Sequence, residues 1–213
     1  MDHRNEPKPQ RTAKREGKSP VISRWTIWRA RFSTPALLAR FDERKVVSLV
    51  AAINGGLAIL AIGFFAWLVD LPLIFPALGP AAFILFSAPM SRAAAPRCVI
   101  LGHFSAMASG FAIWHFMSAL AGRPVSTLTG GWPLFCSASL ALAVSSLLLV
   151  RLSCPHPPAC ASSLVVALGG VTEWLDLLSM ALAVVWITAQ AVAMNRFAGL
   201  PVPAWSPRDQ KAP

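Results

Sequence analysis

Long apolar runs alternate with short polar breaks along the chain, and this pattern predicts an integral membrane protein. Four runs are long enough to be membrane-spanning helices, at residues 46–69, 98–121, 134–150 and 177–195. The first two contain 24 residues each without a charged side chain. At about 1.5 Å per residue, either would cross a hydrocarbon core of about 30 Å. The fold class that we expect is therefore an all-α polytopic membrane protein.

Two further apolar segments, at residues 71–88 and 152–170, are interrupted by proline and glycine. Proline has no amide hydrogen and blocks a continuous helix, but it is favourable at the first helical position. We therefore expect each segment to be an extended stretch followed by a short helix, which starts at Pro80 or at Pro158. With the four long helices this makes six hydrophobic segments. The interrupting residues are Pro72, Pro76, Gly79, Pro80, Pro155, Pro157, Pro158, Gly169 and Gly170.

The order long helix, broken segment, long helix occurs twice along the chain. Residues 76–82 and 155–161 align so that the two broken segments are in register. Because each half would then cross the membrane an odd number of times, the two halves are predicted to be inverted repeats. Paired interrupted segments in corresponding positions are a sequence indicator of a transporter's binding site. If both segments re-enter the membrane instead, only four true spans remain.

Charged residues are rare outside the N-terminal region. The composition is 55% hydrophobic and 13% charged, whereas a soluble domain has about 25% charged residues. Residues 1–45 hold 12 of the 19 Lys and Arg residues, so the net charge of +10 describes a basic tail and not a nucleic-acid-binding surface. With the tail inside and six crossings, six of the seven later basic residues fall inside, as the positive-inside rule requires. We predict a multi-pass protein of a bacterial plasma (inner) membrane with cytoplasmic N- and C-termini.

The segment before the first span is amphipathic. Trp25, Trp28 and Phe32 recur at helical spacing, with arginines elsewhere on the wheel, which is typical of a helix lying in the membrane interface. A loose segment with scattered aromatic residues is the alternative. The predicted organisation is a disordered basic cytoplasmic tail at 1–22, an amphipathic interfacial helix at 23–45, a transmembrane domain at 46–196 and a cytoplasmic C-terminal tail at 197–213.

The stretch 155–158, Pro-His-Pro-Pro, places an imidazole in unwound backbone in or beside the membrane. The first amides of a helix lack intrahelical partners and carry about half a positive charge, which suits an anion. A helix starting at Pro158 would point such amides toward His156, with Ser162 and Ser163 in its first turn. His156 could donate a hydrogen bond or take the proton that accompanies an anion. The alternative is a tight bend in which His156 only bonds a neighbouring carbonyl.

This motif resembles the HPP family of integral membrane proteins, which is named for its His-Pro-Pro tripeptide. A second block supports the resemblance: a small-residue helix after Gly79 and Pro80, a Pro-Arg pair that ends at Arg97, and a Gly-His pair that ends at His103. Together the two blocks cover roughly residues 45–195. The resemblance implies a transporter, and the link of plant plastid members to nitrite transport implies a small inorganic anion as the solute.

Arg97 and His103 also have plainer interpretations. An arginine at the end of a span often anchors the helix by extending its side chain to the interface, and a histidine within a span often makes an interhelical hydrogen bond. The four cysteines lack metal-ligand spacing, and no phosphate-binding loop or nucleophile motif is present. We therefore expect no metal, no cofactor and no enzymatic activity.

The function that we predict is a membrane transporter or channel for a small solute, an inorganic oxyanion such as nitrite. A non-transporting scaffold or sensor is the main alternative, and an intramembrane enzyme is the third. The expected partners are the lipid bilayer and a small anionic solute, without nucleic acid, and a homo-oligomer is left open. The candidate substrate-binding residues are His156, Pro157, Pro158, Ser162, Ser163, Gly79, Pro80, Arg97 and His103.

Overall fold

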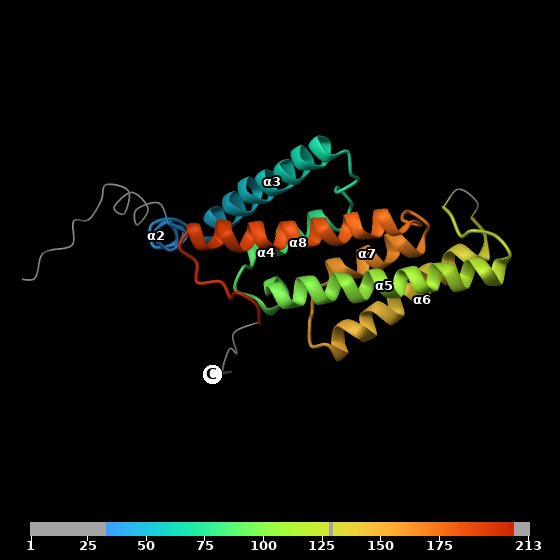
Figure 1. Ribbon diagram of the computed structural model, residues 1–213. Coiled ribbons are helices and arrows are strands. Elements are labelled where there is room, and N and C mark those ends of the chain that lie inside the picture. The colour runs from blue at the N-terminus through green and yellow to red at the C-terminus, as the bar shows by residue number, and fades with distance from the viewer. Residues whose placement is uncertain (1–32, 128–129, 207–213) are drawn as a thin grey trace, which may run out of the picture.

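The computed structural model describes residues 33–127 and 130–206, and every regular element in these two ranges is helical (Figure 1). The tail at 1–22 and residues 23–32 of the segment predicted to be an interfacial helix lie outside the described residues. The elements are α2 (Thr34–Leu38), α3 (Glu43–Val69), α4 (Leu78–Ser87), η1 (Arg92–Ala94), α5 (Pro96–Ala121), α6 (Trp132–Arg151), α7 (Pro158–Ala167) and α8 (Trp174–Phe197).

The four long helices α3, α5, α6 and α8 confirm the predicted spans. Each has 20 to 27 residues and is apolar enough to cross a membrane. Local chemistry explains where they begin and end. The carboxylate of Asp42 accepts the amide of Lys45 at 3.1 Å, so α3 begins at Glu43, three residues before the predicted boundary. Pro96 occupies the first turn of α5, and Gly122 ends that helix with a positive φ of 65°.

The two interrupted segments are broken as predicted. α7 begins at Pro158, and α4 begins at Leu78, two residues before the predicted start at Pro80. Each short helix has ten residues, which corresponds to about 15 Å, or half of a hydrocarbon core of about 30 Å. The chain can therefore cross the membrane at these positions only with the help of the extended residues that precede each helix.

The six apolar segments form two clusters of three helices. The first contains α3, α4 and α8, and the second contains α6, α7 and α5; within each cluster all three pairs are in contact. Each cluster combines the first two segments of one half with the last helix of the other half. Contacts of α5 with α8 and of α4 with α7 join the clusters. Figure 1 shows α5 and α8 running side by side along the bundle.

The charged side chains separate between the two ends of the bundle. At one end, the amide of Thr34 donates to Ala198 at 2.9 Å and that of Arg97 donates to Trp205 at 3.0 Å, which joins α2, the start of α5 and the end of α8 (Figure 1). Most of the basic side chains outside the tails gather at this end. It carries seven basic side chains and two acidic ones, while one basic and three acidic side chains lie toward the other end. The first group is Arg40, Arg44, Lys45, Arg92, Arg97, Arg151 and Arg196 with Asp42 and Glu43, and the second is Arg123 with Asp70, Glu173 and Asp176.

A side chain from a neighbouring long helix donates to one carbonyl in the last turn of each short helix. Pro89 has no amide hydrogen for the carbonyl of Leu85, and Asn195 of α8 fills the vacancy with its Nδ2 at 2.9 Å. Ser137 of α6 similarly donates to the carbonyl of Ala167, at the end of α7, at 2.7 Å. These bonds matter because an apolar environment offers no water to replace them.

We expect Asn195→Leu to destabilise the bundle, because it leaves the Leu85 carbonyl buried without a donor. The free energy of unfolding should fall by about 1–3 kcal/mol, measured by thermal or denaturant unfolding in detergent. Thr188→Val is the matched control, since Thr188 lies buried on the same helix and its hydroxyl donates to the carbonyl of Val184, within that helix, at 2.6 Å. Equal stability of the two variants would show that the cap on α4 is dispensable.

Candidate functional site

The site is built where α5 crosses α7, and small residues allow the two helices to approach closely. Gly102, Ala106 and Gly110 follow at intervals of four along α5 and form one buried stripe. A Cβ atom added at Gly110 would lie 2.5 Å from the carbonyl oxygen of Ser163 of α7, and one added at Gly102 would lie 3.5 Å from the Cβ atom of Ala159. Small residues in such a stripe let the backbones of membrane helices pack directly. The crossing brings the polar side chains of the two elements into contact.

Four groups form a continuous chain of hydrogen bonds at this crossing. Nδ1 of His103 lies 2.7 Å from Oγ of Ser162, and Nε2 of His103 lies 3.2 Å from Nε2 of His156. Nδ1 of His156 lies 2.7 Å from the carbonyl oxygen of Ala93, in η1. Both imidazoles and the Ser162 side chain are fully buried. We call His103 and His156 the histidine pair.

The acceptor at the end of this chain fixes the direction of every bond in it. The Ala93 carbonyl can only accept, so His156 donates from Nδ1. A neutral His156 then has a bare Nε2, which accepts the Nε2–H of His103. Nδ1 of His103 is bare in turn and accepts the hydroxyl proton of Ser162. All four groups are satisfied when both rings are neutral.

Backbone contacts from the basic end hold His156 in place. Its amide donates to the carbonyl of Cys154 at 2.8 Å. The neighbouring carbonyl of Ser153 accepts from Nη2 of Arg92 at 3.2 Å and from the thiol of Cys98 at 3.8 Å. Arg92 therefore ties the residues before the His-Pro-Pro tripeptide to η1, the same element that supplies the Ala93 carbonyl.

The structure corrects the prediction that bare amides after Pro158 point toward His156. The amide of Ala159 donates to the carbonyl of His156 at 3.0 Å, and that of Cys160 donates to Pro157 at 3.0 Å. The carbonyls of the two residues before α7 therefore accept hydrogen bonds from the first amides of that helix. An anion site made from those two amides is therefore absent, and the polar groups at this position are the imidazoles.

Of the remaining predicted residues on α7, Ser162 joins the histidine pair but Ser163 does not. Oγ of Ser163 lies 3.3 Å from Oγ of Ser109 and donates to the carbonyl of Ala141 at 3.2 Å, so it links α7 to α5 and α6. Pro158 is buried at the start of α7, while Pro157 is exposed.

Gly79, Pro80 and Arg97 are not part of the chain of hydrogen bonds. Gly79 and Pro80 are exposed at the start of α4, where Gly79 lines a surface hollow with residues of α3. Arg97 is half-buried in the first turn of α5, nearly two turns before His103. The assignment of all three as substrate-binding residues stays a prediction.

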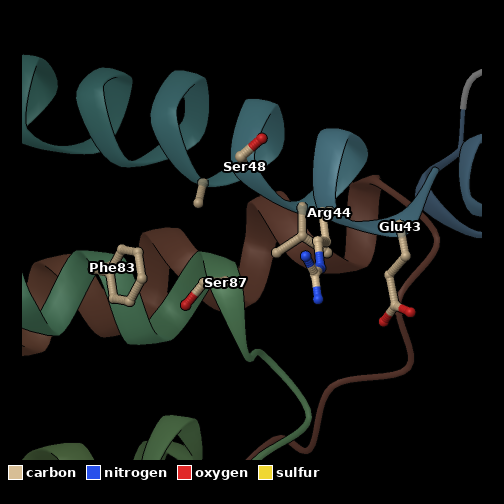
Figure 2. Close-up of a pocket in the computed structure, with 7 residues that line it drawn as sticks. Glu43, Arg44, Ser48, Phe83 and Ser87 are labelled. Carbon is tan, nitrogen blue, oxygen red and sulfur yellow. The ribbon is translucent and has the colours of Figure 1, made fainter. Parts of the chain in front are cut away.

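Surface hollows occur between α3 and α4, away from the histidine pair. The one in Figure 2 lies near the basic end, with Glu43, Arg44 and Ser48 of α3 on one side and Phe83 and Ser87 of α4 on the other. Its lining comes from the outer faces of the first cluster. Within residues 33–127 and 130–206, no group of three or more His, Cys, Asp or Glu side chains is arranged to hold a metal ion.

Comparison with protein families identifies the family of this chain. A family model described as "HPP, transmembrane region" matches residues 42–203. The chain belongs to the HPP family. Searches of curated proteins and of solved structures gave no match.

The HPP assignment gives the histidine pair a sequence context. His103 belongs to the Gly102-His103 dipeptide, and His156 begins the His-Pro-Pro tripeptide. The two histidines are 53 residues apart in this HPP protein, yet a hydrogen bond joins their side chains. Sequence reasoning missed the fourth member of the chain, the carbonyl of Ala93. A backbone carbonyl leaves no signal in a sequence, because every residue has one.

Proposed function

We propose that this HPP protein is a transporter or channel for a small solute, an inorganic oxyanion such as nitrite. It acts in a bacterial plasma membrane, with both termini in the cytoplasm. The observation that carries the proposal is the histidine pair, which is fully buried within the membrane part of the chain. Ionisable groups are costly in a bilayer and usually mark a solute or proton pathway there.

The arrangement of the helices supports the same proposal. In the order of the chain, α3, α4 and α5 of the first half correspond to α6, α7 and α8 of the second. With this correspondence, the cluster of α3, α4 and α8 is equivalent to the cluster of α6, α7 and α5. This relation is the one expected for inverted repeats, which many secondary transporters use for alternating access. The histidine pair lies where the broken segment of one half, through α7, packs against α5 of the other.

The separation of charge supports the proposed orientation. Basic side chains dominate the end of the bundle where Thr34 bonds Ala198. Lys and Arg are retained on the cytoplasmic side of a membrane. Both ends of the described chain lie at this basic end, which supports the proposed cytoplasmic position of both termini.

Reconstituted vesicles test the proposal directly. Purified protein in liposomes should admit nitrite faster than protein-free liposomes of the same lipid, as followed by a lumenal nitrite assay. A panel of other small anions and one neutral solute of similar size would define the selectivity. Equal rates of solute entry with and without protein, for every solute in the panel, would contradict the proposal.

One contact favours a second candidate, an intramembrane hydrolase. Oγ of Ser162 lies 2.7 Å from Nδ1 of His103, and His156 lies behind that imidazole, which is the order of nucleophile, base and orienting group. Ser162 is fully buried within α7, however, and helical amides are engaged with carbonyls and do not offer an oxyanion hole. Covalent labelling of Ser162 by a fluorophosphonate would favour the hydrolase over the transporter.

A further inference from the structure

We propose that the histidine pair binds one proton together with the transported anion, so that the protein is an electroneutral proton–anion symporter. This inference rests on the proposed transport function and specifies its coupling. Three features carry it: the capacity of the chain of hydrogen bonds for one added proton, the closed end of that chain, and the lack of compensating charge around the pair.

The chain has room for one more proton at one position. A single proton occupies the 3.2 Å between the two Nε2 atoms, and a second proton cannot enter there. The bare ring nitrogen that faces a hydroxyl is Nδ1 of His103. When it takes a proton, the Ser162 hydroxyl turns and accepts from it, and the positive charge is shared with His156 through the Nε2–H bond.

The opposite end of the chain is closed to protons. His156 donates to the carbonyl of Ala93, which accepts a hydrogen bond but does not carry a proton onward. A proton that enters past Ser162 is therefore stored by the pair and leaves only when this arrangement changes. A storage site of this kind suits coupled transport and does not suit a continuous proton channel.

A proton alone would be strongly disfavoured at this position. The pair is fully buried, and the Phe75 ring lies edge-on to His103 with ring centroids 6.5 Å apart. An unpaired charge in such surroundings costs far more than a neutral ring. A monovalent anion that arrives with the proton removes this cost, because the loaded site is then neutral overall.

The groups around the pair do not provide that negative charge. The elements packed against it carry basic, imidazole or thiol side chains, and α4 carries no titratable side chain. Those nearest the pair in the chain are Arg92 in η1, Arg97 and Cys98 at the start of α5, Arg151 at the end of α6, Cys154 beside His156, and Cys160 in α7, while His115 and Cys136 lie toward the opposite ends of α5 and α6. The acids among the described residues lie at the ends of α3 and α8. They are Asp42, Glu43, Asp70, Glu173 and Asp176.

Proteoliposomes with a trapped pH-sensitive dye test the coupling. An inward nitrite gradient should acidify the lumen by one proton for each nitrite that enters through the protein. The rate in protein-free vesicles is subtracted, because nitrous acid also crosses bare lipid. With the membrane potential clamped by potassium and valinomycin, the rate should not change with the potential. Nitrite entry that follows the potential without acidification would overturn the symport inference and leave transport standing. No protein-dependent entry of any solute would overturn the transport function itself.

A variant and a spectroscopic measurement give an independent test. His103→Gln keeps a hydrogen-bonding side chain but cannot take the proton, so protein-dependent acidification should fall to the protein-free level. Acidification at an unchanged ratio would contradict the assignment of the proton to the pair. Nitrogen-15 spectra of histidine-labelled protein in bilayers should show two neutral rings without anion and an imidazolium signal with nitrite. An imidazolium signal of the same size with and without nitrite would also overturn the inference, even if the protein transports nitrite.

Discussion

His156→Ala should abolish nitrite flux while the protein still inserts and folds. The substitution removes the central ring of the chain of hydrogen bonds and leaves Nε2 of His103 and the carbonyl of Ala93 without their partners. An added proton could no longer be shared between two rings, and the buried polar groups left behind would cost about 1–3 kcal/mol of stability each. Flux in proteoliposomes should fall to the level of protein-free liposomes.

His115→Ala is the matched control for this experiment. His115 lies on the same long helix as His103, but it is exposed, and its ring contacts are with Phe111 and Trp114. Flux through His115→Ala should remain close to that of the wild type. Wild-type flux through properly inserted His156→Ala would show that the histidine pair does not serve transport.

Gly110→Ala should destabilise the protein and weaken the site, because α5 and α7 would be forced apart. The added Cβ atom would lie 2.5 Å from the carbonyl oxygen of Ser163, which belongs to the backbone and cannot rotate away. Overpacking of this kind costs about 1–3 kcal/mol. Unfolding in detergent would measure the loss, and flux should fall with it, since the same crossing sets the contact between His103 and Ser162.

Gly56→Ala is the control for the glycine substitution. Gly56 lies within the long helix α3, and an added Cβ atom there meets no atom within 4 Å. Alanine is favoured over glycine within a helix by up to about 1 kcal/mol, so this variant should be as stable as the wild type or more so. Equal effects of the two substitutions would mean that the close approach at Gly110 does not limit stability.

The sequence alone determined the class of the fold and the number of its segments. Uncharged runs of about 20 residues favour a helix in a bilayer, because a helix satisfies nearly all of its backbone groups within the same segment. Proline adds equally local information, since it lacks a donor wherever it occurs. For that reason the breaks before α4 and α7 could be predicted to within two residues, and His156 could be placed in unwound backbone.

Only the tertiary structure decided how the site is composed. The sequence indicated His156, His103 and Ser162 separately, but the hydrogen bonds that join them depend on a helix crossing set by Gly102 and Gly110. Gly79 and Pro80 were grouped with the site by the paired interrupted segments and by resemblance, and Arg97 by resemblance, but all three lie outside the chain of hydrogen bonds. The first amides of α7, which were predicted to be free, donate to the carbonyls of His156 and Pro157. Propensity and hydrophobic pattern are properties of short stretches, whereas a site depends on contacts between residues far apart in the chain.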